Sequence, residues 1–206
     1  MKIPLLNLNR EYSYLKKKID AQIRNCLSSQ QWILGKQVEE FERKAANYMG
    51  TNYAVGVSSG TEALILSLSA LAQKRKGKGF FDRDDEIITT PFTFLATAEA
   101  IVRVGAKPVF VDIDKDSFNI DPEKIKKAIN KKTVGILPVH LYGRICQIDK
   151  ICRIAKDNNL FILEDAAQSF GATYPVQGKK DKKAGSWGNL AAFSFFPSKN
   201  LGAFGD

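Results

Sequence analysis

Three short segments of the chain combine residue types that could perform chemistry. The first is Ser58-Ser59-Gly60-Thr61, which lies between a short apolar run and a predicted helix. A helix N-terminus presents unpaired backbone N–H groups and a partial positive charge, so it favours phosphate. Gly60 would allow a close backbone approach, and Thr61 would add a hydroxyl donor. The alternative is a plain helix cap with Ser59 or Thr61 at the N-cap position.

The second segment places Asp165 at the carboxyl end of a predicted apolar strand. Open α/β sheets bind their ligands beyond these strand ends. A carboxylate is costly to bury there unless it meets a cation, and a protonated pyridine nitrogen would be such a partner. The alternative is that Asp165 caps the next helix.

The third segment places Lys199 just after an aromatic strand, with Ser194 close by in sequence. A lysine in this position could act as a Schiff-base nucleophile beside a phosphate site. Partial desolvation would lower its pKa and keep part of the amine neutral. The alternative is an ordinary exposed lysine in a loop.

The hydrophobic pattern predicts elements that would position these segments. Strand-like runs alternate with helical periodicity, and the expected strands cover 54–57, 86–90, 108–113, 134–139, 160–165 and 190–196. Helices are expected between them, one that carries Leu64, Leu68 and Leu71 and others over 97–104, 122–129 and 148–158. Several strands are continuously apolar, which is typical of parallel strands covered on both faces. We therefore predict a doubly wound, mainly parallel α/β sheet.

The N-terminal part has a different pattern. Residues 1–50 are expected to form a helical segment with helices over 11–27 and 36–49, and Gly50 stands where a helix C-cap glycine is expected. The α/β domain would cover 51–206. Within it, the lysine-rich stretch 74–81 is expected to be an exposed insertion, and 178–183 a loop or hairpin.

Composition narrows the class of protein. The 206 residues are 44% apolar and 26% charged, as in globular proteins, and the net charge is +9. No nucleic-acid-binding module accompanies this charge, so we predict a solvated basic surface and no nucleic-acid partner. The three cysteines, Cys26, Cys146 and Cys152, and the single His140 indicate neither a disulfide framework nor a metal site. Without a signal peptide or a run of about 18 apolar residues, a cytoplasmic protein with no membrane partner is expected.

Seven segments together resemble the DegT/DnrJ/EryC1/StrS family of pyridoxal-phosphate-dependent sugar aminotransferases. They follow the order of the family motifs and lie at 32–35, 57–61, 93–98, 109–113, 138–143, 164–168 and 194–206. The resemblance implies the large domain of the aspartate-aminotransferase fold, fold type I. It also implies pyridoxal 5'-phosphate as the cofactor.

The resemblance assigns a role to each matched position. It implies that Lys199 is the Schiff-base lysine and that Asp165 pairs with the pyridine nitrogen, which makes these two the catalytic residues. It also implies that Gln168 lies near the 3-hydroxyl of the ring and that Phe94 stacks on the ring. Gly60, Thr61 and Ser194 would form the phosphate cradle. His140 receives no catalytic role, and we expect it to make a structural hydrogen bond.

The implied reaction transfers an amino group, with glutamate as the expected donor, to a nucleotide-linked keto-sugar. Segments 166–172 and 194–199 are most similar to members that aminate 3-keto sugars, in particular acetamido-keto-glucuronate aminotransferases of O-antigen synthesis. The full-length form is expected to be a homodimer. Related sugar dehydratases carry histidine in place of the Schiff-base lysine, so Lys199 argues against that activity. An inactive fragment or a regulatory protein of the same family is the remaining alternative.

The resemblance covers only the N-terminal part of the family pattern. Family members are nearly twice as long, and the remainder would contain the last strand of the large domain, the small domain and an asparagine that reaches the partner's phosphate site. We therefore expect the 206-residue chain alone to be unstable or inactive. A purified 206-residue monomer that folds, binds pyridoxal phosphate and turns over would contradict this expectation.

Overall fold

The computed structural model describes residues 3–4 and 6–205. Two compact units divide the chain, the first ending at Gly56 and the second beginning at Val57. None of the helices built from the described residues is both long enough and apolar enough to cross a membrane.

The first unit contains two helices, α1 (Leu8–Ser29) and α2 (Lys36–Met49). The Asn7 side chain caps α1 by accepting a hydrogen bond from the backbone N–H of Asn9 at 3.1 Å. Gly50 ends α2 in the left-handed conformation at φ 76°, and its N–H donates to the carbonyl of Ala46. Both predicted helices and the glycine cap are confirmed.

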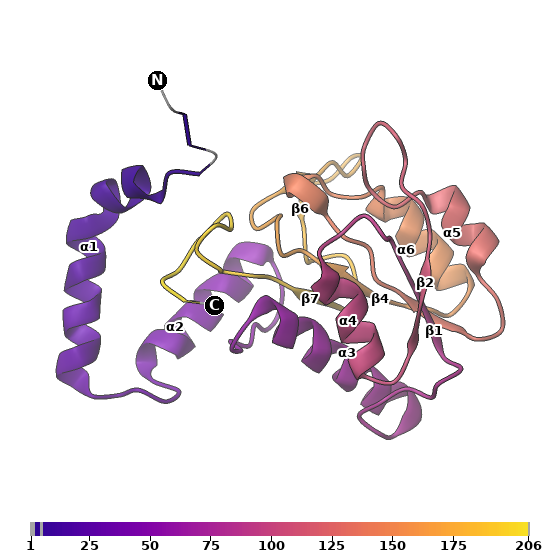
Figure 1. The fold of residues 1–206 in the computed structure, drawn as a ribbon, viewed down its shortest axis with the longest axis horizontal. Helices are drawn as coiled ribbons and strands as arrows, with labels where there is room; N and C mark the ends of the chain where they lie inside the picture. The colour runs from indigo at the N-terminus through magenta and orange to yellow at the C-terminus, as the bar shows by residue number, and fades with distance from the viewer. Residues whose placement is uncertain (1–2, 5, 206) are drawn as a thin grey trace. The chain divides into compact units, whose positions relative to one another are not determined.

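The second unit is built on a five-stranded sheet (Figure 1). Its spatial order is β2-β1-β3-β4-β7, and every neighbouring pair is parallel. The strands are β1 (Glu86–Thr89), β2 (Lys107–Phe110), β3 (Thr133–Ile136), β4 (Phe161–Asp165) and β7 (Leu190–Ala192). The predicted parallel α/β sheet is therefore confirmed.

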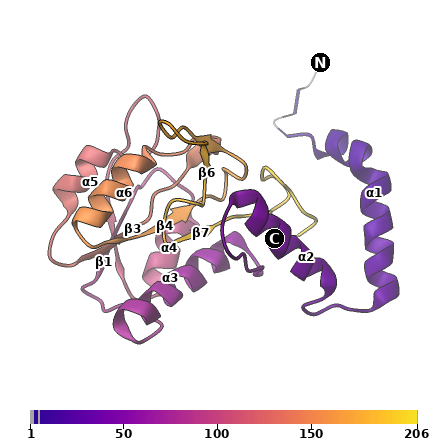
Figure 2. The same cartoon turned by 180° about the vertical axis from the view of Figure 1, so that it is seen from behind.

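Helices cover both faces of this sheet (Figures 1 and 2). One face carries α3 (Gly60–Lys76) and α4 (Leu95–Arg103), and the other carries α5 (Pro122–Ala128) and α6 (Ile148–Asp157). Successive strand residues point to opposite faces, so Leu163 packs under α3 and α4 while Ile162 packs under α5 and α6. Burial on both faces explains why the strands are continuously apolar.

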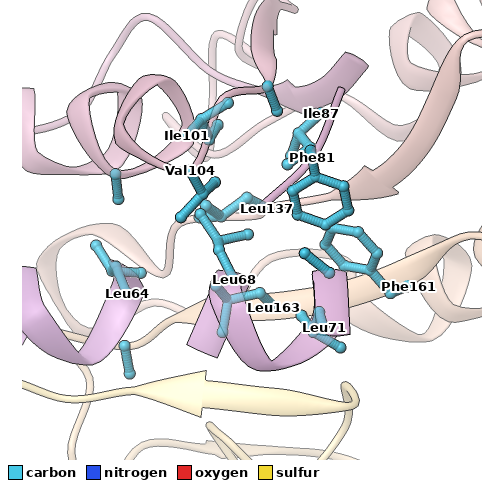
Figure 3. Packing of buried hydrophobic residues seen from close by; sticks show 14 of the residues in the cluster. Leu64, Leu68, Leu71, Phe81, Ile87, Ile101, Val104, Leu137, Phe161 and Leu163 are labelled. Carbon is cyan, nitrogen blue, oxygen red and sulfur yellow. The ribbon is translucent and has the colours of Figure 1, made fainter. Parts of the chain in front are cut away.

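Figure 3 shows the cluster between the sheet and the α3–α4 face, into which α3 points Leu64, Leu68 and Leu71. At its edge the rings of Phe81 and Phe161 stack with centroids 5.7 Å apart. The expected exposure of the segment 74–81 is confirmed for residues 74–77, 79 and 80, but the two ends of the insertion differ from the expectation. The helix α3 continues to Lys76, and Phe81 is buried because it stacks on β4.

Four predicted strands differ from the structure: the strands predicted over 108–113 and 134–139 end early, at Phe110 and Ile136, and the other two differ as follows. Residues 54–57 form no strand in the described chain, and Val55 is 78% exposed. The N–H of Gly56 donates instead to the carboxylate of Glu42 at 2.6 Å. The strand predicted to reach residue 196 ends at Ala192, which pairs with Asp165, the last residue of β4.

A small antiparallel pair of strands, β5 (Thr173–Tyr174) and β6 (Lys182–Lys183), flanks the turn predicted as a loop or hairpin. The Tyr174 hydroxyl donates to the Asp149 carboxylate at 2.8 Å. This bond fixes the hairpin to the start of α6, so the loop is attached to the helical layer.

We expect Leu68→Ala to lower the free energy of unfolding by about 2–5 kcal/mol, because it leaves a cavity in the α3 core. Leu68 is completely buried, whereas Leu66 on the same helix is 50% exposed. Leu66→Ala is therefore the matched control and should cost less than about 1 kcal/mol. Urea denaturation of both variants measures the difference. Equal losses would contradict the assigned face of α3.

Candidate active site

Polar side chains from distant parts of the sequence meet at the carboxyl end of the sheet. Asp165 is the last residue of β4 and is buried. Its N–H donates to the carbonyl of Pro138 at 2.9 Å, and its carbonyl accepts from the N–H of His140 at 3.0 Å. The loop after β3 is thereby joined directly to the end of β4.

The Asp165 carboxylate is held at both oxygens. Oδ2 accepts from the hydroxyl of Thr97 at 2.8 Å, and Oδ1 accepts from the N–H of Ala167 at 3.2 Å. Burial raises the pKa of the Asp165 carboxyl, and these two hydrogen bonds act in the opposite direction. No helix begins directly after Asp165 in the part of the chain that the structure describes, so the alternative of a helix cap was wrong.

The neighbouring Glu164 is fully buried on the other face of the strand, and its carboxylate has four donors. Three are backbone N–H groups, from Gly185 at 2.8 Å, Trp187 at 2.8 Å and Gly188 at 2.7 Å. The fourth is Nε2 of His140 at 2.9 Å. Burial by itself would raise the pKa of Glu164, but the His140 ring and the backbone N–H groups lower it overall.

His140 is fully buried and connects Glu164 to the next loop. Its Nδ1 accepts from the N–H of Cys146 at 3.3 Å, which assigns the ring proton to Nε2 and makes the ring a donor to Glu164. The structural hydrogen bond predicted for His140 is confirmed. Within residues 3–4 and 6–205, no group of three or more His, Cys, Asp or Glu side chains could hold a metal ion.

The N-terminus of α3 lies against the loop that follows β7. Ser59 is the N-cap, and its side chain accepts from the N–H of Glu62 at 3.1 Å. A Cβ atom at Gly60 would lie only 2.7 Å from Cβ of the buried Ser194. Only glycine therefore allows this approach, which brings the Ser194 backbone beside the first turn of α3, where Thr61 also lies.

Lys199 is half-buried in a turn after β7, where its N–H donates to the carbonyl of Phe196 at 2.8 Å. It lines a cavity of about 430 Å³ together with Tyr142, Gln168, Ser198 and Asn200. The positive charge of Lys199 is the smallest of the influences that lower the pKa of Asp165.

Gln168 has a fixed orientation in this cavity. Its Oε1 accepts from the N–H of Tyr142 at 2.9 Å, so its amide N–H groups remain as donors. Tyr142 belongs to the short helix η1 (Leu141–Gly143) and has a φ of 54°, which is strained for a residue with a bulky side chain. The left-handed backbone turns this N–H toward Gln168.

The structure thus brings some of the predicted site residues together in pairs. Gly60 lies against Ser194, and Gln168 shares a cavity with Lys199. Phe94 is the N-cap residue of α4 and is 73% exposed, three positions before the threonine that holds Asp165.

Sequence reasoning missed Thr97, Glu164 and Tyr142. Thr97 is a polar residue on the apolar face of a predicted helix, and this pattern could have identified it.

Comparisons with known proteins identify a family and relatives that the chain matches. The model of the DegT/DnrJ/EryC1/StrS aminotransferase family matches residues 13–206. A protein of Pseudomonas aeruginosa named UDP-2-acetamido-2-deoxy-3-oxo-D-glucuronate aminotransferase is 42% identical over 204 residues, covering 99% of this chain and 53% of the relative. A Geobacillus stearothermophilus protein named pleiotropic regulatory protein is 43% identical over 206 residues, covering 100% and 52%.

The fold is similar to that of a solved aminotransferase-type structure. The NtdA protein of Bacillus subtilis, described with bound cofactor PMP, matches with a TM-score of 0.85 and 32% identity, over 99% of this chain and 43% of that chain. The chain has the parallel sheet and covering helices of fold type I aminotransferases. It spans about half the length of the curated relatives it matches.

We expect Glu164→Gln to lower the free energy of unfolding by about 2–3 kcal/mol at pH 7, because an amide cannot accept from all four donors. The pKa of Glu164 lies below its usual value of 4.5, so its ionised form contributes stability above that pH. This contribution is lost as the pH falls through the folded-state pKa. The difference between wild type and variant should therefore be constant from about pH 8 to 5 and shrink below 4.5.

Denaturant titrations across this pH range measure the effect. Glu99→Gln removes an exposed carboxylate that pairs with Arg103, and it should cost less than about 1 kcal/mol. A loss for Glu164→Gln that does not change between pH 7 and pH 3.5 would show that the charge of Glu164 is not what the four donors stabilise.

Proposed function

The chain belongs to the DegT/DnrJ/EryC1/StrS aminotransferase family, and from this premise we propose that it forms the cofactor-binding part of a pyridoxal 5'-phosphate-dependent nucleotide-sugar aminotransferase. The observation that carries the proposal is the pairing of a buried, oriented carboxylate with a lysine-lined cavity. Asp165 lies at the end of β4 with both oxygens hydrogen-bonded, and Lys199 lines the cavity together with Gln168.

The residues present fit this cofactor. The close approach at Gly60 supports a phosphate cradle at the N-terminus of α3, where Thr61 and Ser194 would add hydroxyl groups. Buried Asp165 has a raised pKa, and its hydrogen-bond donors among the described residues, Thr97 and Ala167, are uncharged, which suits a protonated ring nitrogen. The free amide N–H of Gln168 suits the 3-oxygen of the ring.

Phe94 is exposed and would stack on the face of the ring. Its place at the start of α4 puts it three residues from the threonine that holds Asp165. Asp165, which is held by α4 through its threonine, would thus contact the ring nitrogen. Phe94, at the start of the same helix, would contact the face of the ring.

The bound cofactor supplies a sink for the electron pair left when a proton is removed from an amine-bearing carbon. Asp165 would keep the ring nitrogen protonated, and each pKa unit by which it does so corresponds to about 1.4 kcal/mol. Lys199 would hold the cofactor covalently through Nζ, with loss of water. During amino transfer, Nζ of Lys199 would serve as the group that accepts and returns the proton.

We further propose a 3-keto nucleotide sugar as acceptor and glutamate as amino donor. The name of the P. aeruginosa relative supports a 3-keto sugar as the acceptor, because it specifies a 3-oxo sugar linked to UDP. A homodimeric, cytoplasmic enzyme of surface-polysaccharide or O-antigen synthesis is the fuller form of this proposal. A sugar dehydratase is disfavoured because Lys199 stands where those enzymes carry histidine.

A regulatory protein is the second candidate function. The Geobacillus relative with 43% identity is named as a regulatory protein, and the chain carries a net charge of +9. A regulator acting through this charge would bind DNA without cofactor, and its affinity would fall steeply with salt. An enzyme would bind the cofactor at Lys199, so the two candidates differ in a direct measurement.

We expect the full-length form to bind pyridoxal 5'-phosphate covalently and Lys199→Ala to lose the covalent bond, because Lys199 carries the one amine among the described residues that line the cavity. Borohydride reduction followed by peptide mass spectrometry locates the modified lysine. Lys156→Ala removes an exposed lysine on α6 and should label normally. Labelling of Lys199→Ala at another lysine to the wild-type extent would overturn the assignment, and salt-sensitive DNA binding without labelling would favour the regulator.

A further inference from the structure

A chain of hydroxyl groups leads from the loop before α4 to the carboxylate of Asp165. The Thr93 and Thr97 hydroxyl oxygens are 2.8 Å apart, and Thr97 Oγ1 is 2.8 Å from Asp165 Oδ2. Thr97 is fully buried on α4, and Asp165 is 68 residues away in the sequence. The function proposed above assigns no cofactor contact to either threonine.

The direction of this chain follows from the number of protons available. When Asp165 is ionised, as it would be opposite a protonated ring nitrogen, its carboxylate only accepts hydrogen bonds, so the single hydroxyl proton of Thr97 points to Asp165. The oxygen of Thr97 is then an acceptor, and Thr93 must be the donor to it. The polarity is therefore Thr93 to Thr97 to Asp165, and each bond strengthens the next.

The same helix turn also fixes the loop that carries the exposed aromatic residue. The backbone N–H of Thr97 donates to the carbonyl of Phe94 at 3.2 Å, while the two threonine side chains bond across the same turn. A shift of Thr97 would consequently move both the carboxylate and the start of α4.

We propose that Thr97 is a positioning residue: its hydroxyl orients the Asp165 carboxylate toward the ring nitrogen of the cofactor, and Thr93 ties the Phe94 loop to that same carboxylate. This inference rests on the cofactor-binding function proposed above. Thr97 and Ala167 occupy one acceptor position on each carboxylate oxygen and leave the remaining lone pairs for a single N–H ligand.

Electrostatics act in the same sense as the geometry. Asp165 is buried, and burial favours its neutral form. The Thr97 hydroxyl and the Ala167 N–H favour the charged form, which is the form that retains a proton on a bound ring nitrogen. Loss of the Thr97 hydroxyl would destabilise the charged form of Asp165 and would also release its carboxylate from the fixed orientation.

Thr97→Val keeps the volume of the side chain and removes the hydroxyl. We expect it to bind pyridoxal 5'-phosphate about 10- to 100-fold more weakly, the range for losing a hydrogen bond to a charged group. With cofactor labelled with ¹⁵N at the ring nitrogen, NMR should show deprotonation of that nitrogen at a pH about one unit lower than in wild type. Thr97→Ser restores a hydroxyl and should return both values to within about threefold of wild type.

Thr89→Val is the matched control, because Thr89 is also fully buried and its hydroxyl donates at 2.8 Å, but to the carbonyl of Leu137. It should lower thermal stability as Thr97→Val does and leave the affinity and the ¹⁵N midpoint unchanged. Identical affinity and midpoint in the two valine variants would overturn the positioning role. Absence of cofactor labelling in the wild-type protein would instead overturn the function on which the inference rests.

Discussion

Burial of two adjacent carboxyl groups at the end of β4 is the constraint on which the site depends. Glu164 and Asp165 point to opposite faces of one strand, and both are almost inaccessible to water. A buried carboxylate is costly unless hydrogen bonds or a cation compensate for the lost hydration. The structure compensates the two neighbours differently, and this difference separates a structural role from a functional one.

Glu164 is compensated entirely by the protein itself. Its four donors come from the His140 loop and from the turn over 185–188, so a single side chain fixes two loops to the sheet. Asp165 has only two donors and retains a raised pKa. A carboxylate held in orientation but short of positive charge is suited to a cationic ligand, which is why Asp165 and not Glu164 is the candidate ligand residue.

The parallel topology brings the other groups to this point. Because all five strands run in the same direction, the loops after β3, β4 and β7 all leave the sheet at the carboxyl ends of the strands. The N-terminus of α3 reaches the same region, where Gly60 packs against Ser194. Asp165 is held by a strand and a helix, whereas Lys199 is held by a turn.

The sequence by itself determined the α/β alternation, the parallel strands, the Gly50 cap and the segments that meet at the site. These features depend on local patterns of burial and backbone conformation, which each stretch of sequence carries on its own. Tertiary structure alone decided that residues 54–57 form no strand, that Phe81 is buried against Phe161, and that Thr97 holds Asp165. The partner of a buried polar group or a strand is set by how distant segments cross, and residues 68 positions apart leave no local pattern that records such a contact.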